Sequence, residues 1–308
     1  MGLVPQHFYD DLEMDIDEGN LYGEQDERVI KMAVTAVREA LGSIQLDQPV
    51  PLILAFPEPE DHDLSFPTSL VTNLLAQQDL PLAKELIRTL HTGRAGGIEA
   101  LGLAQRYLYE LQHDYVLVGA SDSYFHCARL SGMALADRLL APENMDGFAP
   151  GEGAGFLLLT RHMDRAMVRN KRIIGLLKPG MGEEKGHMHN PEETYTGGGL
   201  DSAFKMALSN HNILQMGSVY SSMNGEHYWS KEHGVAMMRN HRLMADDVEV
   251  EHPADCYGDI GAASGPVLTG LAANALLNKA GSSDQALVYC ASEGAARAAV
   301  CLQVLSAQ

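Results

Sequence analysis

The sequence has few cysteines, no long apolar run and no visible targeting segment. Its four cysteines form no CxxC pair and show no metal-ligand spacing; they are Cys127, Cys256, Cys290 and Cys301. No stretch approaches the roughly 18 apolar residues of a membrane-spanning helix, and no charged leader with an apolar core opens the chain. These absences argue against a membrane segment and favour a reducing compartment, so we expect a cytoplasmic protein.

Basic residues are scarce for a chain of 308 residues. There are 22 Lys and Arg against 41 Asp and Glu, which gives a formal net charge of −19 at pH 7. Nucleic acids and anionic membranes are bound through an excess of Lys and Arg, so the balance argues against both as partners. It also argues against an acidic protein partner, unless the few basic residues cluster. Apolar residues make up 45% of the chain, which is ordinary for a globular protein with a full core.

Two similar stretches, one in each half of the chain, carry the fold prediction. In the first, the glycine-rich turn Gly93–Gly97 precedes a helical pattern and the apolar run Asp114–Ser121. In the second, the turn Gly258–Gly265 precedes a helix over Pro266–Lys279 and the run Ala286–Ser292. Glycine lets the backbone of such turns approach another element closely. The two copies predict a duplicated α/β fold in which two helix N-termini meet at the centre.

Hydrophobic periodicity and turn residues place the remaining elements. We predict helices over Glu27–Leu41, Thr68–Gln77, Pro81–Leu90, Phe125–Leu140, Leu200–Asn210 and Lys231–Met244. We predict strands over Pro51–Phe56, Phe156–Thr160, Arg172–Leu177, Gly217–Ser221 and Val248–Glu251, and a polar loop over Lys178–Gly199. The chain is expected to divide into an acidic N-terminal arm (residues 1–26), a first half (27–165) and a second half (166–308).

Two groups of residues could be drawn as sites, and each has a simpler interpretation. Cys256, with His252 and Asp259 close in sequence, could be a nucleophile with its base, or Cys256 could be a structural cysteine. His187 and His189 lie among glutamates, but their spacing matches no metal geometry, so we expect a solvated loop. We predict no metal and no cofactor.

Four segments of the chain resemble the β-ketoacyl synthases of the thiolase-like superfamily. The most specific is DGFAPGEGAGFLLL (Asp146–Leu159), similar to their DGFvxGEGAGalvL. GDIGAASG (Gly258–Gly265) resembles their GHxxGAAG turn. TGRAGGIEALGLA (Thr92–Ala104) lies where they carry TACSSSLxAlhlA, and VYSSMNGE (Val219–Glu226) lies where they carry vnAHGTxTxxGD. The resemblance covers the chain from about Glu27 onward and implies a duplicated αβαβα sandwich that usually dimerises through its first half.

The same resemblance implies a chemistry for which this chain lacks the residues. The family uses a cysteine at a helix N-terminus, helped by two histidines or by a histidine and an asparagine. In this chain Arg94 occupies the position that matches the cysteine. Ser222 occupies the position that matches the first histidine, and Asn224 lies two residues after it. Asp259 falls on the histidine of the glycine-rich turn, and Ala254 falls on a lysine five residues before it. A guanidinium stays protonated and an ionised carboxylate repels a developing enolate, so we expect no catalytic residue.

Two structural expectations follow from this match. The fold should bring the turns of Arg94 and Asp259 together, where the two side chains either form a buried ion pair or face solvent independently. The family's first strand should precede the helix at Glu27, yet residues 1–25 show no run typical of a buried strand. The arm therefore either replaces this strand or the chain is a truncated relative.

Two functional hypotheses remain open. The first is a catalytically degenerate ketosynthase-like protein, a pseudoenzyme that binds partners as a homodimer or heterodimer. Similar degenerate relatives occur among accessory proteins of bacterial type VI secretion clusters, where the partner would be an effector or adaptor. The second is an acyltransferase or acyl-binding protein that handles an acyl thioester with an altered set, Asp259, Ser222 and Asn224. For this second role, Arg94 with Lys84 and Arg88 could form a basic patch for an acidic carrier protein.

Overall fold

The computed structural model describes residues 21–42, 44–58, 65–77, 79–209, 215–278 and 284–307. Up to Thr160 its elements are α1 (Leu21–Leu41), β1 (Val50–Ala55), α2 (Ser65–Ala76), β2 (Leu82–Leu90), α3 (Gly96–Tyr109), β3 (Tyr115–Ser123), α4 (Cys127–Leu135) and β4 (Glu152–Thr160). After that come β5 (Arg172–Leu176), β6 (Gly180–Glu183), α5 (Gly198–Ala207), β7 (Met216–Ser221), α6 (His227–Arg239), β8 (Met244–Glu251), α7 (Ala254–Tyr257), α8 (Ser264–Asn278), β9 (Gln285–Ala291) and β10 (Ala296–Ser306). The 3₁₀ turns η2 (Gly93–Ala95) and η5 (Gly261–Ala263) lead into α3 and α8.

The strands form two mixed sheets with the same internal order. The first sheet has the order β2-β1-β3-β4, and the second has the order β8-β7-β9-β10-β5, with β6 also paired to β10. β1 is parallel to β2 and β3, and β7 is parallel to β8 and β9. β4 and β10 run antiparallel to β3 and β9. The matching order and directions confirm the predicted duplicated α/β fold.

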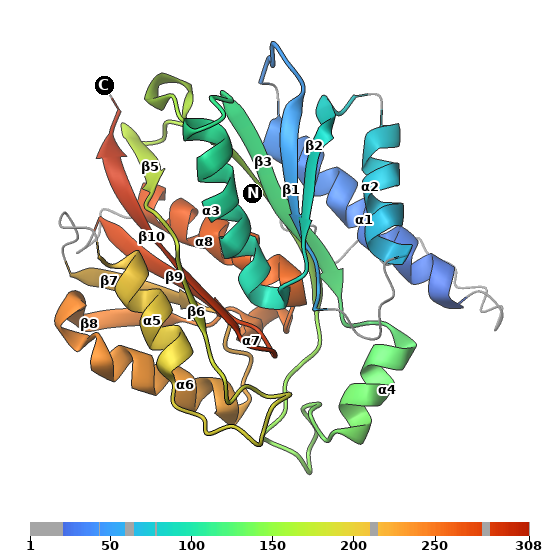
Figure 1. Ribbon diagram of the computed structural model, residues 1–308, viewed down its shortest axis with the longest axis vertical. Helices are drawn as coiled ribbons and strands as arrows, with labels where there is room; N and C mark the ends of the chain where they lie inside the picture. The colour runs from blue at the N-terminus through green and yellow to red at the C-terminus, as the bar shows by residue number, and fades with distance from the viewer. Residues whose placement is uncertain are drawn as a thin grey trace.

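Five layers alternate through the molecule, because each sheet is apolar on both faces. The inner faces of both sheets pack against α3 and α8, which lie between the sheets (Figure 1). α1 and α2 cover the outer face of the first sheet, and α5 and α6 cover the outer face of the second (Figure 1). This arrangement is the predicted αβαβα sandwich. It buries β1 and β9 completely and β3 except at its two end residues, as their apolar runs indicate.

The two central helices touch backbone to backbone at their N-terminal ends. A Cβ atom added to Gly97 of α3 would lie 2.3 Å from Cδ of Pro266 in α8, and one added to Gly265 would lie 3.0 Å from Cα of Gly97. Only glycine at these two positions allows such a close approach. The contact holds the turns before both helices next to each other, and those turns carry the candidate site.

The helix predicted over Pro81–Leu90 is wrong, since this segment forms strand β2. Its apolar residues Leu82, Leu86, Ile87 and Leu90 have a helical spacing. The pairing of β2 with β1 shifts register between Leu82 and Ile87. The irregularity breaks the alternation of a regular strand, so that Leu86 and Leu90 face the inner core while Leu82 and Ile87 face the outer one. The register shift therefore gives this edge strand the apolar spacing of a helix.

The loop predicted over Lys178–Gly199 contains strand β6, which pairs with β10. A Cβ on Gly180 or Gly182 would lie 2.1 Å or 2.0 Å from backbone oxygens of Ala203 or Gly199, so the residues facing α5 had to be glycine and left no apolar signal. From the sequence we predict no strand over Ala296–Ser306, the segment that forms β10. The helix predicted over Phe125–Leu140 is confined to Cys127–Leu135.

The predicted N-terminal arm, residues 1–26, falls largely outside the described residues. Helix α1 begins at Leu21, ahead of the predicted start at Glu27. The divisions proposed at 26/27 and 165/166 therefore stay predictions. Within the described ranges, no helix combines the length and apolarity needed to cross a bilayer.

Replacement of Gly97 by alanine is expected to destabilise the protein by about 1–3 kcal/mol, because the added methyl group overpacks the contact between α3 and α8. Gly102→Ala in the same helix is the matched control, since its Cβ would lie 3.7 Å or more from Pro179, an ordinary contact. That variant should gain about 0.5–1 kcal/mol from helix propensity. Urea unfolding measures both, and equal effects of the two substitutions would contradict the proposed close packing.

Candidate functional site

Two glycine-rich turns form the base of the candidate site. Gly93 begins η2 with φ 62°, and Gly261 begins η5 with φ 55°, so the corresponding residue of each copy has the left-handed backbone that favours glycine. A Cβ on Gly261 would also lie 1.9 Å from a carboxylate oxygen of Asp122. Each turn leads directly into a central helix. Arg94 and Asp259 are thus presented at the junction of the two copies.

Arg94 and Asp259 form a buried ion pair. Nε of Arg94 donates to both carboxylate oxygens of Asp259, at 3.1 and 3.0 Å, and an Nη2–Oδ2 contact completes the pair. The two side chains are 3% and 2% exposed. Burial alone would lower the pKa of Arg94, but the charges of Asp259 and Glu293 outweigh it and hold that pKa well above its ordinary value. The buried pair is confirmed, and the alternative of independent, solvent-facing groups is wrong.

Donors occupy both oxygens of the Asp259 carboxylate. Besides Arg94, Oδ1 accepts a hydrogen bond from the backbone N–H of Gly261 at 2.9 Å, and Oδ2 accepts one from Nδ2 of Asn224 at 2.8 Å. Charge-assisted bonds of this kind hold a carboxylate in one place. Both carboxylate oxygens of Asp259 therefore accept hydrogen bonds from neighbouring groups of the protein.

A second ion pair lies behind the first. Arg138 binds Glu226 through two hydrogen bonds, from Nε at 2.7 Å and from Nη2 at 2.9 Å. The indole of Trp229 donates to the same carboxylate at 3.0 Å. Nδ2 of Asn224 also lies 3.0 Å from Glu226, so this amide connects the two carboxylates of the site. Both carboxylates are thereby fully engaged.

Glu293 links the two pairs and extends them to the surface. Its Oε1 accepts from Arg138 at 2.9 Å and from Arg94 at 3.4 Å, and its Oε2 lies 3.5 Å from Nε2 of His189. Burial would raise the pKa of Glu293, but the hydrogen bond from His189 and the two guanidinium groups lower it below its usual range. The contact with Glu293 raises the pKa of His189 in return.

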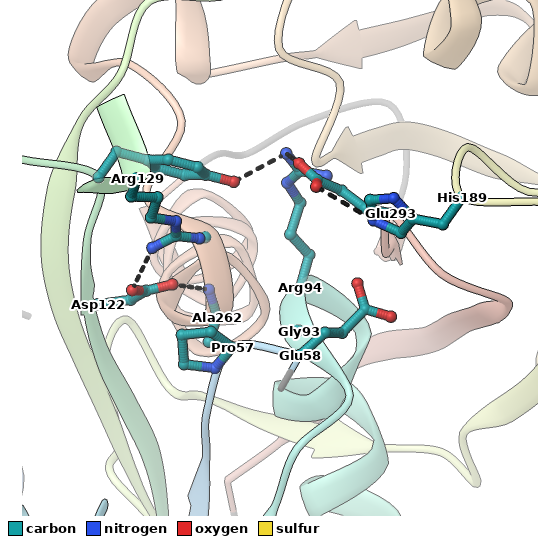
Figure 2. Close-up of a pocket in the computed structure, with 11 residues that line it drawn as sticks. Pro57, Glu58, Gly93, Arg94, Asp122, Arg129, His189, Ala262 and Glu293 are labelled. Atoms are coloured by element: carbon teal, nitrogen blue, oxygen red, sulfur yellow. Dashed lines mark hydrogen bonds and ion pairs between the residues drawn. The ribbon is translucent and has the colours of Figure 1, made fainter. Parts of the chain in front are cut away.

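A cavity of about 600 Å³ opens beside this network (Figure 2). Six of its eleven lining residues have acidic or basic side chains; the lining is formed by Pro57, Glu58, Gly93, Arg94, Asp122, Tyr124, Arg129, His189, Gly261, Ala262 and Glu293. Arg129 on one wall pairs with Asp122 at 2.9 Å, while Glu293 and His189 form the opposite wall (Figure 2). Pockets for apolar ligands are lined mostly by apolar side chains. This lining therefore does not suit an apolar acyl chain.

The other two positions matched to the family site lie next to the ion pair. Oγ of Ser222 accepts a hydrogen bond from the backbone N–H of Ala291 at 3.0 Å. Ser222, Ala254 and Asp259 line a second cavity of about 10 Å³, which has room for about one water molecule. The structure thus gathers all five matched residues around one point.

Two of the four thiols are buried and two are exposed. Cys290 of β9 is buried, and burial raises its pKa to about 12. Cys301 is buried as well. Cys256 is exposed in α7, and the imidazole of His252 lies 3.1 Å from the carboxylate of Asp255. No hydrogen bond joins Cys256 to a base in the part of the chain that the structure describes.

The other candidate groups separate in space. His189 reaches the large cavity, but no group of metal-binding side chains is found among the described residues. Lys84 and Arg88 are exposed on β2 while Arg94 is buried, so the basic patch drawn from these three residues is wrong.

Sequence reasoning missed most of the charged network. Asp122, near the end of β3, and Glu293, just after β9, both follow an Ala-Ser pair, so the repeat itself gave a signal for them. Glu226 lies two residues after Asn224 in a segment that the resemblance already marked. Arg138 gave no signal, because it reaches the site only through the fold.

Comparisons with known proteins support the fold alone. No family model matches the chain, and no curated protein matches it by sequence. Among solved structures, the ketosynthase from module 6 of the bacillaene synthase of Bacillus subtilis 168 gives a TM-score of 0.67 at 14% identity, over 92% of this chain and 59% of that one. This chain therefore spans well under two thirds of that ketosynthase.

Two similar structures are complexes. The AntDE ketosynthase with its acyl-carrier protein AntF gives a TM-score of 0.69 at 13% identity, over 90% of this chain and 84% of that one. The ketosynthase ApeO from Xenorhabdus doucetiae, in complex with its chain length factor ApeC, gives 0.62 at 16%, over 87% and 77%. The chain has the fold of thiolase-like ketosynthases.

The ion pair of Arg94 and Asp259 is expected to show strong energetic coupling. Each of Arg94→Met and Asp259→Asn should cost about 3–5 kcal/mol, because it leaves the other charge buried without its partner. The double variant should recover about 2–3 kcal/mol relative to additivity. Arg106→Met with Glu110→Gln is the matched control, an exposed pair expected to couple by less than about 0.5 kcal/mol. Urea unfolding of both cycles tests this, and equal coupling would contradict it.

Acid is expected to remove the stability that Glu293 supplies. The lowered pKa of Glu293 means that the folded state binds this proton less tightly than the unfolded state. Its contribution is therefore complete above the unfolded-state pKa of about 4.3 and is lost as pH falls further. His189 has the opposite sign: its raised pKa adds stability below about pH 6.5, which is lost as pH rises.

Urea unfolding at stepped pH measures this effect. The difference in unfolding free energy between the wild type and Glu293→Gln should narrow as pH falls from about 5 to about 3. Glu143→Gln, at an exposed loop residue, serves as the control and should change stability by less than about 0.5 kcal/mol. A difference that stays as wide in acid would show that Glu293 is not held in its ionised form.

Proposed function

We propose that this chain is a ketosynthase-like protein without condensing activity, which acts by binding other proteins. The observation that carries the proposal is the ion pair of Arg94 and Asp259, which occupies the junction where the resemblance places a nucleophile and a histidine. Both charges are buried and satisfied by their neighbours. Such an arrangement stabilises a fold but has no group free to react.

Acyl transfer needs a nucleophile that is deprotonated or lies beside a base. Arg94 stays protonated and cannot carry an acyl group. Ser222 accepts a hydrogen bond from a backbone amide, and no imidazole is bonded to it within the described ranges. Cys290, the nearby thiol, is buried and has its pKa raised to about 12, so almost none of it is thiolate at neutral pH. None of these three side chains is therefore a reactive nucleophile.

Condensation also needs donors that stabilise a developing negative charge. Asp259 presents a negative charge at the position matched to a histidine. Among the donors of the matched set, the amide of Asn224 is already shared by Asp259 and Glu226, and the guanidinium of Arg94 is bonded to Asp259. An enolate formed here would meet an anion and find the neighbouring donor occupied.

Two solved structures with a similar fold support a role in binding proteins, because both are complexes. The ketosynthases AntDE and ApeO are solved in complex with an acyl-carrier protein and a chain length factor. With a formal charge of −19, this chain would attract a neutral or basic partner more readily than an acidic carrier protein. A homodimer or heterodimer, a cytoplasmic location and a setting among bacterial type VI secretion proteins stay predictions.

The proposal predicts that acyl thioesters leave no acyl group on the protein. The native chain is incubated with acetyl-, malonyl- and octanoyl-CoA, each alone and with an acyl-carrier protein, and its intact mass is measured beside a catalytically active ketosynthase. We expect the mass to stay unchanged while the active enzyme gains one acyl group.

A stoichiometric adduct would contradict the proposal and favour the altered-site acyltransferase. Ser222→Ala and Cys290→Ala then locate the group, because loss of the adduct in one variant identifies the acylated side chain. Hydrolysis of the thioester without an adduct would also contradict the proposal if Ser222→Ala abolished it.

A further inference from the structure

One wall of the 600 Å³ cavity holds a buried hydroxyl group that donates to nothing in the described ranges. Tyr124 is 2% exposed, and its oxygen accepts a hydrogen bond from Nη2 of Arg94 at 3.1 Å. Burial raises the pKa of Tyr124, so the hydroxyl keeps its proton at neutral pH. A buried donor without an acceptor is costly. An acceptor atom of a bound molecule would therefore be favoured beside Tyr124.

Arg129 adds further unused donors to the same wall. Its Cζ lies 3.7 Å from the centre of the Tyr124 ring, so the guanidinium is stacked on that ring. Nη1 donates to Asp122 at 2.9 Å and to the carbonyl oxygen of Ser123 at 3.0 Å. Nε and Nη2 have no acceptor among the described residues. These two nitrogens form one edge of the guanidinium, and such an edge binds a carboxylate through two parallel hydrogen bonds.

The opposite wall carries a carboxylate that no cation neutralises. Both oxygens of Glu58 lie 3.0 Å from the backbone N–H of Gly294, which donates to them. Within the described ranges no Lys, Arg or His forms an ion pair with Glu58. Figure 2 shows its carboxylate on the far side of the cavity from Arg129, on the same side as Glu293. A positive group of a bound molecule would find its partner here.

The charge around the cavity favours a ligand that carries a positive group. Each of the three guanidinium groups of the site is paired with a carboxylate of its own. The carboxylates of Glu58 and Glu293 remain in excess of these pairs. Protonation of His189, which contacts Glu293, would neutralise only one of the two. An anion without a positive group is therefore repelled, although the wall of Arg129 offers donors to an anionic group.

We propose that the cavity binds a small organic zwitterion, whose carboxylate contacts the free edge of Arg129 and the hydroxyl of Tyr124 while its ammonium group contacts Glu58. The two walls of one cavity make opposite demands, and a molecule with both groups satisfies them together. The volume of about 600 Å³ is within the range of pockets for small molecules. This ligand site goes beyond the proposed binding of proteins and does not rest on it.

Calorimetric titration of the full-length protein at pH 7.5 tests the proposal. The probe is 4-aminobutyrate, which carries one carboxylate and one ammonium group. Butyrate and butylamine are the matched ligands, because each keeps one charged group and the short chain. We expect a Kd of about 1 mM for 4-aminobutyrate, as suits so small a ligand, and at least about tenfold weaker binding of the other two. Trp229, the one tryptophan of the chain, lies 5.1 Å from the guanidinium of Arg94 and supplies a fluorescence readout.

Two variants test the two ends of the ligand separately. Glu58→Gln should weaken binding of 4-aminobutyrate about tenfold and remove its advantage over butyrate, because the ammonium group loses its partner. Tyr124→Phe should weaken binding to a similar extent and reduce the advantage over butylamine. Glu143→Gln removes one negative charge from an exposed loop and should leave all three affinities unchanged. Urea unfolding shows whether each variant is folded at the temperature of the titration.

The outcomes that would overturn the proposal are distinct. Absence of binding at about 20 mM 4-aminobutyrate would leave the cavity to water. Equal binding of 4-aminobutyrate and either matched ligand would show that one wall takes no part. An equal loss of affinity for all three ligands in Glu58→Gln would indicate a merely structural role for this residue. Acylation of the protein would refute the noncatalytic role and leave these affinities unchanged, so the two proposals fail separately.

Discussion

The ion pair between Arg94 and Asp259 is the interaction on which the rest of the structure depends. Each residue belongs to one of the two glycine-rich turns, and the pair is almost fully shielded from solvent. A charge in such a place is tolerated only with its partner present and its remaining hydrogen bonds satisfied. The close contact of Gly97 with α8 brings the turns together, and the pair then requires that they stay together. Backbone packing and electrostatics thus fix the same junction.

Further charged side chains surround this pair and are themselves paired. Arg138, Glu226 and Glu293 form a second layer in which every carboxylate faces a guanidinium. The cavity next to it is lined by charged side chains that are held by their neighbours. A site for acyl chemistry requires apolar walls and one unpaired reactive group. Here the polar groups of the junction are paired with one another, which supports the noncatalytic role that we propose.

The outer surfaces are where the two copies differ. In the second sheet β5 and β6 complete the pairing of β10, whereas the outer side of β4 has no strand among the described residues. β5 precedes α5, so the corresponding place in the first copy is ahead of α1, where residues 1–20 lie outside the described ranges.

The sequence by itself determined the fold class. The apolar runs of β1, β3 and β9, the two glycine-rich turns and their order along the chain predict a duplicated α/β fold, since each pattern is local and depends on one stretch of residues. The αβαβα sandwich came from the resemblance to the β-ketoacyl synthases. The repeat also marked Arg94 and Asp259 as neighbours. Only the tertiary structure decided that they pair, that β2 is a strand and that Arg138 joins the site. Those outcomes depend on contacts between residues distant in the chain, whose energies no local pattern contains.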